Sequence, residues 1–281
     1  MITFKNIGLE AARLGNQMSQ YAAVLGLAYK NNYKFAIPYQ NQYKSGTMFN
    51  LDPNVQSWIK VNFRVPEGFN ITAPNLVEED EVNITNNYEE PIGFDPTFFN
   101  LPDDTNLHGY FQCEKYWSHI QDVIRKEFTF KDEFRNEAQS QIVQIRNNNT
   151  PLVSVHIRRG DYVGNQNRHP LQTLEYYQTA LNVFDDDDYT FLIFSDDLNW
   201  CKKYFGDSER IVYIDGNIDF VDMCMMSLCD HNIIANSTFS WWGAWLNANP
   251  NKKVIAPSNW LGPEIKHLQT NDLYCTNWII I

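Results

Sequence analysis

The chain has 281 residues, of which 43% are hydrophobic and 20% are charged, and its formal net charge at pH 7 is −12. This length allows two domains with a large buried core, and the apolar content excludes a largely disordered chain. The negative charge disfavours nucleic acid partners, and no stretch approaches the roughly eighteen apolar residues of a membrane-spanning helix, which leaves only peripheral membrane association open.

The first half of the chain predicts a strand–helix–strand unit followed by a long irregular segment. A strand at residues 2–7 leads through a turn into a helix at residues 17–31, and residues 35–37 form the next strand. Residues 39–102 are rich in Asn and Pro, which is typical of a binding loop or cover. A further helix is expected at residues 115–128.

The second half alternates strands with helices, which indicates parallel βαβ units. Its strands are continuous apolar runs, as expected when helices cover both faces of a sheet. The polar segment at residues 146–150 is the predicted boundary, so that one domain spans residues 1–148 and the other residues 149–281. The predicted strands are 153–157, 190–194, 211–214, 232–235 and 254–256, and the predicted helices are 171–184, 199–205, 220–229 and 240–247.

Polar clusters directly follow three of these strands, at residues 156–161, 195–197 and 236–240. In open α/β sheets, ligands bind at the edge formed by the carboxyl ends of the strands. We therefore expect the three clusters to contribute to one ligand site.

The sharpest of these signals is the pair Arg158 and Arg159, followed by Gly160 and Asp161. A guanidinium group binds phosphate oxygens with two parallel hydrogen bonds and stays charged, and a glycine lets the backbone approach a ligand. The alternative is an ion pair with a nearby aspartate at the surface. His156 at the same strand end favours the ligand site.

The cluster at residues 236–240 precedes a predicted helix. Hydroxyl groups and backbone N–H groups at a helix start can bind phosphate. An ordinary helix N-cap is the alternative, and the position at the sheet edge favours the phosphate site. The residues of this cluster are Asn236, Ser237, Thr238, Phe239 and Ser240.

Other polar segments give weaker signals. Ser195, Asp196 and Asp197 suit a nucleobase, a ribose, a metal ion or a helix cap. The run at residues 185–188 resembles a metal cluster, but consecutive aspartates usually form a solvated turn, and we expect no metal. The turn at Gly15 and Asn16 contains one glycine, so it is neither a dinucleotide fingerprint nor a P-loop.

The five cysteines include no Cys-x-x-Cys pair, and the N-terminus lacks the apolar core of a signal peptide. An odd number of cysteines without such a pair argues against a disulfide framework and against a zinc site. We therefore expect a cytoplasmic protein with reduced thiols.

Taken in order, these motifs resemble those of the α-1,2-fucosyltransferases of glycosyltransferase family 11, and the resemblance covers nearly the whole chain. The string His-Ile-Arg-Arg-Gly-Asp at residues 156–161 is the most specific element. The other segments that carry the resemblance are Arg13–Met18, Gly109–Gln112, Ser195–Asp197 with Trp200, and Ser237–Trp245.

The resemblance implies an α/β fold of the GT-B type, with two Rossmann-like domains and the active site in the cleft between them. Residues 1–148 would form the acceptor-side domain and residues 149–281 the GDP-sugar-binding domain. It implies an inverting galactoside α-1,2-fucosyltransferase, which moves L-fucose from GDP-fucose to the 2-hydroxyl of a terminal galactose without a metal or other cofactor. Two alternatives remain: a GDP-sugar transferase of different acceptor or linkage, and a non-catalytic module that binds nucleotides or glycans.

The resemblance also implies roles for individual residues. Arg158 would hold the donor phosphates, and His156 and Asp196 would contact the guanine or its ribose. Thr238, Phe239 and Ser240 would line the diphosphate, and the turn at Gly15 and Asn16 would face the same site from the first domain.

The general base is the least defined part of the predicted site. Related α-1,6 enzymes carry a glutamate a few residues beyond the double arginine, where this chain has Asn165 and Gln166, and neither is a base. Asp161 is the candidate for the base or for orienting Arg158, and we favour the orienting role.

Overall fold

The computed structural model describes residues 1–5, 7, 13–38, 65–71, 76–77, 84–146, 150–184, 188–268 and 271–281. The chain divides into two compact units, Met1–Thr129 (unit 1) and Phe130–Ile281 (unit 2). Each unit is a mixed α/β structure built on a parallel sheet, as the sequence predicts. The two units meet in sequence at the start of a helix, whereas the boundary expected from composition lies at the end of that helix.

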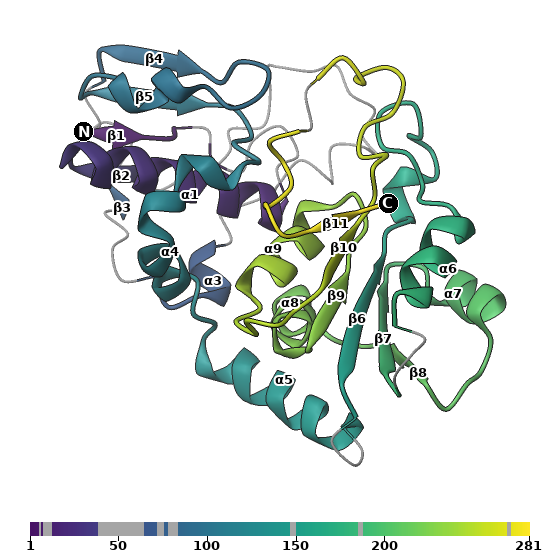
Figure 1. Cartoon of the computed structure of the whole chain (residues 1–281). Coiled ribbons are helices and arrows are strands. Elements are labelled where there is room, and N and C mark those ends of the chain that lie inside the picture. The colour runs from purple at the N-terminus through teal and green to yellow at the C-terminus, as the bar shows by residue number, and fades with distance from the viewer. Residues whose placement is uncertain are drawn as a thin grey trace, which may run out of the picture. The chain divides into compact units, whose positions relative to one another are not determined.

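Unit 2 is built on a six-stranded sheet (Figure 1). Its strands are β6 (Leu152–Ile157), β7 (Thr190–Ser195), β8 (Ile211–Ile214), β9 (His231–Ile233), β10 (Val254–Ala256) and β11 (Ile279–Ile280). Their order is β11-β10-β9-β6-β7-β8, and every described pair is parallel. The chain runs outward from β6 to β8 and then returns to the other side of β6, which is the strand order of the doubly wound dinucleotide-binding fold. The direction of winding therefore reverses between β6 and β9, and a crevice at this point is where such sheets bind ligands.

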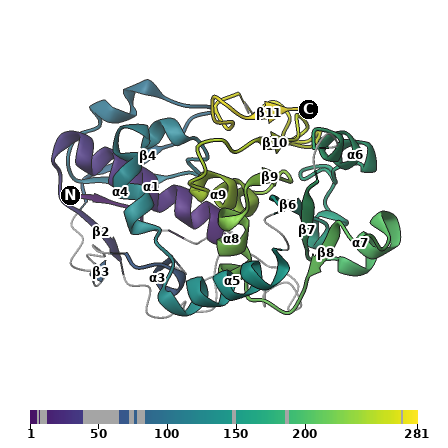
Figure 2. The ribbon, with the colours of Figure 1, turned by 60° about the horizontal axis from the view of Figure 1, so that its bottom comes forward.

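Helices cover both faces of this sheet. They are α5 (Asp132–Ile145), α6 (Leu174–Asn182), α7 (Leu198–Phe205), α8 (Asp219–Leu228) and α9 (Thr238–Leu246), with a 3-10 turn, η5, at Gly160–Tyr162. Figures 1 and 2 show α6 and α7 on one face and α5, α8 and α9 on the other.

The side chains of β6 alternate between the two faces, as strand geometry requires. Val153 and Val155 belong to the apolar core that includes Tyr177 of α6. On the opposite face, Ser154 accepts a hydrogen bond of 2.7 Å from Asn232, whose amide also donates to a main-chain oxygen of α8. His156 therefore lies on the face covered by α8 and α9, and it reaches the carboxyl edge of the sheet from that side.

The predicted strands and helices of unit 2 are confirmed, with boundaries that differ by up to three residues. The helix expected at residues 171–184 begins at Leu174, because Thr173 caps it through a hydrogen bond from the Tyr176 N–H. Helix α5 was not predicted. Ala138 and Ile142 are its two buried residues, and Phe134 stacks on Phe220 of α8, so that a mostly polar helix carries only a narrow apolar stripe.

Unit 1 contains a five-stranded sheet of order β3-β2-β1-β5-β4. The strands are β1 (Ile2–Thr3), β2 (Phe35–Pro38), β3 (Leu76–Val77), β4 (Asn86–Glu89) and β5 (Thr105–His108). The described pairs are parallel, and β5 lies beside β1 on the side opposite β2. Its helical segments are α1 (Leu14–Asn31), α3 (Val65–Gly68), α4 (Gln121–Glu127), η2 (Pro96–Asn100), η3 (Glu114–Tyr116) and η4 (Ser118–Ile120).

Helix α1 is the central helix of unit 1. It is rich in Ala and Leu, which favour helix, and nearly all its residues from Leu14 to Ala28 are buried. Gly26 lets the helix approach η3 closely, since a Cβ there would lie 2.0 Å from the main-chain oxygen of Tyr116. The helix ends at Asn32, which adopts the left-handed conformation with φ of 55°.

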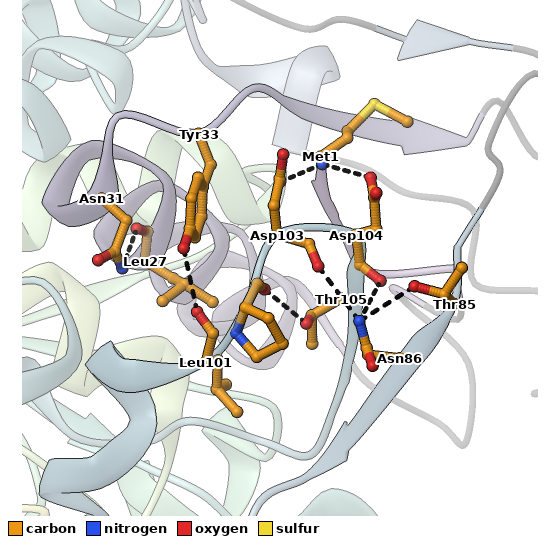
Figure 3. A network of polar contacts seen from close by, with 11 residues as sticks. Met1, Leu27, Asn31, Tyr33, Thr85, Asn86, Leu101, Asp103, Asp104 and Thr105 are labelled. Atoms are coloured by element: carbon orange, nitrogen blue, oxygen red, sulfur yellow. Dashed lines mark hydrogen bonds and ion pairs between the residues drawn. The ribbon is translucent and has the colours of Figure 1, made fainter.

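Part of the segment expected to be irregular is ordered. Residues 84–102 contain β4 and η2, and residues 39–64 lie outside the described residues. Figure 3 shows how the turn before β5 is held: the Asn86 amide donates to the main-chain oxygens of Asp103 and Asp104, and the Tyr33 hydroxyl donates to that of Leu101. These bonds join distant segments, so the local sequence could not reveal them. The helix expected at residues 115–128 is divided into η3, η4 and α4.

Candidate functional site

The predicted polar clusters of unit 2 meet at the carboxyl edge of its sheet. β6 ends at Ile157 and is followed by Arg158, and the neighbouring β7 ends at Ser195 and is followed by Asp196. The Arg158 guanidinium lies 2.5 Å from the Asp196 carboxylate through Nη1, and Nη2 pairs with Asp161. Two carboxylates thus orient the guanidinium of Arg158 from both sides.

Arg159 has a different role from its neighbour. Its main-chain N–H donates to Asp196 over 2.8 Å, and its Nε donates to Asp197 over 3.0 Å. Its guanidinium lies over the Trp200 ring, 4.1 Å from the ring centre, which is a favourable cation–π contact. The side chain of Arg159 therefore stabilises the start of α7. Of the two arginines, Arg158 is the one whose position suits a ligand.

Aspartates 196 and 197 are tied to these arginines and to the next helix. Asp197 caps α7 by accepting a hydrogen bond of 3.1 Å from the Trp200 N–H. The hydrogen bond from Arg159 holds the pKa of Asp197 below its usual range. The metal interpretation of this segment gains no geometric support, and the described residues contain no group of three His, Cys, Asp or Glu side chains placed to hold a metal. Of the aspartate run, residues 185–187 lie outside the described residues.

Gly160 is required for a reason that differs from the sequence interpretation. A Cβ at this position would lie 2.4 Å from Oδ2 of Asp196. The space that a glycine leaves is therefore filled by the Asp196 carboxylate rather than reserved for a ligand.

The third cluster lies at the start of α9, which follows β9 on the other side of β6. The N-cap residue Ser237 makes no side-chain capping bond, and the Ser240 hydroxyl donates to the main-chain oxygen of Ser237 over 3.2 Å. Thr238 and Phe239 form the first turn of the helix. Because the side chain of Ser237 does not cap it, the positive end of the helix dipole is suited to an anion.

Asn236 braces the loop before this helix. Its buried amide group donates to the main-chain oxygens of Pro170 and Trp260, at 3.0 and 3.1 Å, and its own main-chain oxygen accepts from the Tyr162 hydroxyl. Its Oδ1 is buried and has no hydrogen-bond partner among the described residues. Tyr162 also lies under the Arg158 guanidinium, at 5.4 Å, so the first and third clusters are mechanically linked.

His156 completes the site at the end of β6. Its side chain is 6% exposed, and its ring lies 5.7 Å from the ring of Phe239. Its Nδ1 has no hydrogen-bond partner within the part of the chain that the structure describes. Burial, together with the positive charge of Arg158, lowers the pKa of His156 to about 3. The imidazole is therefore neutral at pH 7 and available as a hydrogen-bonding group.

Gly15 and Asn16 lie in the first turn of α1, the helix that follows β1 in sequence. Asn16 accepts a hydrogen bond of 2.9 Å from Gln112, and Gln20 donates to the main-chain oxygen of Gly109 over 3.0 Å. The structure thus brings together two motifs that are about ninety residues apart in sequence. That this turn faces the unit 2 site stays a prediction.

Sequence reasoning missed Glu90, which lies directly after β4. Its Oε2 accepts hydrogen bonds of 2.7 Å from the N–H groups of both Tyr110 and Phe111. Burial raises the pKa of Glu90 to about 7, although the two N–H bonds act in the opposite direction. No local signal marks this glutamate, since it follows an unpredicted strand.

A family model described as Glycosyl transferase family 11 matches residues 5–281. The chain belongs to glycosyltransferase family 11.

Two curated relatives illustrate what the chain is similar to over most of its length. An α-1,2-colitosyltransferase of Escherichia coli is 31% identical, and the alignment covers 96% of this chain and 97% of that protein. The galactoside α-(1,2)-fucosyltransferase 1 of Homo sapiens is 27% identical over 83% of this chain, and it is longer, so that only 63% of it is covered.

Solved fucosyltransferase structures share the fold of this family 11 chain. NodZ, an α-1,6-fucosyltransferase whose crystal was soaked with GDP-fucose, superimposes with a TM-score of 0.52 at 12% identity, covering 87% of this chain and 91% of NodZ. POFUT1 in complex with GDP gives a TM-score of 0.53 at 14% identity, and the superposition covers 91% of this chain and 97% of POFUT1.

None of the helices among the described residues is long and apolar enough to cross a membrane.

The state of His156 gives a direct test of the site geometry. The folded chain lowers the pKa of this imidazole, so its contribution to stability is present above the unfolded value near 6.5 and is lost as the pH falls toward 3. We expect the ring resonances of His156, assigned with a His156→Gln variant, to show no titration between pH 5 and pH 8 in NMR spectra. A midpoint between pH 6 and pH 7 would mean that the ring is solvated rather than buried.

Proposed function

We propose that this family 11 glycosyltransferase moves L-fucose from GDP-fucose to the 2-hydroxyl of a terminal galactose, with inversion, to form an α-1,2 linkage. The observation that carries the proposal is the position of Arg158. It lies at the carboxyl end of β6, beside the reversal point of the sheet, and α9 begins on the other side of that point. A guanidinium group and a helix N-terminus are both suited to a diphosphate.

The relatives and fold neighbours support the choice of substrates. The human relative is named a galactoside α-(1,2)-fucosyltransferase, and the NodZ and POFUT1 structures contain GDP or GDP-fucose. We extend the GT-B arrangement of two domains around a substrate cleft to the two units of this chain.

In the proposed reaction the acceptor 2-hydroxyl attacks the anomeric carbon and releases its proton, while the bond from that carbon to the diphosphate oxygen breaks. Positive charge develops on the sugar and negative charge on the departing GDP. Arg158 and the first turn of α9, which includes Ser240, face that negative charge, and such preorganised groups are usually the largest contribution to a rate enhancement. The arginine supplies the charge that a metal provides elsewhere, so we propose that the reaction needs no metal.

Asp161 and Asp196 serve Arg158 in different ways. The side chain of Asp196 is 26% exposed and also accepts the Arg159 N–H, whereas that of Asp161 is 41% exposed and lies on the short turn η5. We therefore assign Asp196 as the permanent partner and Asp161 as the one that the donor phosphate displaces. This favours orientation of the empty guanidinium, rather than proton removal, as the role of Asp161. His156 and Asn236 each offer a buried polar atom to the nucleotide.

A second candidate is the transfer of colitose, which is L-fucose without its 3-hydroxyl. The observation that favours it is the 31% identity to an α-1,2-colitosyltransferase over nearly the full length of both chains. The two donors can be distinguished by competition, with equal amounts of GDP-fucose and GDP-colitose supplied together. The ratio of the two products, measured by mass spectrometry, then gives the ratio of kcat/KM for the two donors.

The proposed activity is tested by incubating the purified protein with GDP-fucose and lactose, with and without EDTA. We expect release of GDP and a trisaccharide whose NMR spectrum shows an α-1,2 linkage, at a rate that EDTA does not change. Loss of turnover with EDTA and its recovery with a divalent cation would contradict the metal-free mechanism. Release of GDP without transfer of fucose to lactose would support GDP-fucose as the donor and contradict lactose as the acceptor.

Substitution of Arg158 tests the assignment of the diphosphate site. Removing one preorganised group of this kind typically costs about 2.7–4 kcal/mol, so Arg158→Ala should lower kcat roughly 10²–10³-fold. Arg158→Lys should recover only part of the loss, because an ammonium group lacks the bidentate geometry. Arg135→Ala is the matched control, since it removes an exposed arginine from α5. A near-normal kcat for Arg158→Ala would contradict the assignment of Arg158 to the departing diphosphate.

A further inference from the structure

The turn that follows β5 has an unusual backbone. Gly109 has φ of 143° and Phe111 has φ of 51°, a region that side chains other than glycine rarely adopt. The Glu90 carboxylate holds this turn through its hydrogen bonds of 2.7 Å from the Tyr110 and Phe111 N–H groups. A Cβ at position 109 would lie 2.4 Å from the Glu90 Cβ, so the glycine and the glutamate fit each other closely.

With this backbone conformation, the consecutive aromatic side chains of Tyr110 and Phe111 lie in different environments. Phe111 is fully buried, and its ring centre lies 6.0 Å from that of Phe4 and 5.1 Å from that of Tyr116. Tyr110 is 45% exposed. The buried ring anchors the turn in the core of unit 1, and the turn then displays the other ring at the surface.

The exposed ring of Tyr110 lies just beyond the carboxyl end of β5, at the edge of the unit 1 sheet. The turn begins where β5 ends, at the carboxyl edge of the parallel sheet, and its Gln112 side chain donates to Asn16 at the start of α1. The carboxyl edge of the strands is where open α/β sheets bind their ligands. An exposed aromatic ring at this place can serve a substrate.

We propose that Tyr110 is the aromatic platform against which the terminal galactose of the acceptor stacks, and that Glu90 is the positioning residue that holds it outward. The inference rests on the proposed function, since it names a contact of the acceptor in that reaction. Galactose has one face rich in C–H groups, which suits the face of a phenol ring, while its hydroxyl groups remain available for hydrogen bonds.

The charge of the turn favours the acceptor over the donor. Residues 109–112 carry no positive charge, and the group that holds them is a carboxyl. Such a surface disfavours a diphosphate and accepts a neutral sugar. The groups suited to phosphate, Arg158 and the start of α9, belong to unit 2.

Steady-state kinetics with lactose and GDP-fucose test the platform. Tyr110→Ala should raise the KM for lactose by about tenfold, whereas Tyr110→Phe should stay within about twofold of the parent, because the stacking face is kept. The KM for GDP-fucose and the slow hydrolysis of GDP-fucose without acceptor should not change. Tyr29→Ala is the matched control, since Tyr29 is 50% exposed near the other end of α1.

The role of Glu90 is tested by comparing two substitutions. Glu90→Gln keeps an oxygen that can accept the two N–H groups, so it should retain a normal KM for lactose. Glu90→Ala should reproduce the effect of Tyr110→Ala on that KM. An equal loss of kcat and stability in both Glu90 variants, with no selective change in the KM for lactose, would reduce Glu90 to a structural residue.

Binding of lactose, followed by saturation-transfer NMR, reports on Tyr110 independently of turnover. If the parent uses GDP-fucose and Tyr110→Ala leaves both lactose binding and its KM unchanged, or raises only the KM for GDP-fucose, the platform is wrong and the proposed function stands. If the parent shows no turnover but binds lactose through Tyr110, the proposed reaction is wrong and the platform stands. A parent that neither binds lactose nor transfers fucose to it contradicts both.

Discussion

The Asp196 carboxylate is the group on which the unit 2 site depends. It accepts the Arg159 N–H, pairs with the Arg158 guanidinium, and occupies the space that Gly160 leaves. One side chain at the end of β7 thereby fixes the backbone and the arginine at the end of β6. Because strong charge-assisted bonds of this kind are directional, Arg158 is oriented before a ligand arrives. A preorganised cation avoids the cost of reorganisation when negative charge develops on a leaving group.

A carboxyl group also fixes local structure in unit 1, where it holds the backbone of a turn, whereas in unit 2 it holds an arginine side chain. Glu90 fixes the backbone of Tyr110 and Phe111, and Gln112 connects the same turn to Asn16. In both units the constrained segment follows a strand at the carboxyl edge of a parallel sheet, and in unit 2 that strand borders the point where the winding reverses. The topology therefore explains why short polar motifs, scattered along the chain, gather at the carboxyl edges of the two sheets.

The sequence predicts the parts of this arrangement that depend on local pattern. The apolar runs of unit 2 and the polar residues after them place the strands and the clusters, and the string at residues 156–161 is specific enough to indicate the family. Helix α5 is hard to recognise from local pattern, because it fully buries only Ala138 and Ile142 and packs Phe134 against Phe220 of α8. The role of Glu90 depends on a contact with residues some twenty positions away, and the neutral state of His156 depends on burial under α9. Such properties arise from tertiary packing and leave no signal in a single segment.

We propose that the donor diphosphate occupies the edge of the unit 2 sheet between β6 and β9. The decisive experiment is a crystal structure of the full chain with bound GDP. We expect phosphate oxygens within hydrogen-bond distance of the Arg158 guanidinium and of the first turn of α9, with Asp196 still paired to Arg158 and Asp161 displaced. A GDP molecule bound elsewhere, with the Arg158 pairs to both Asp161 and Asp196 unchanged, would contradict it.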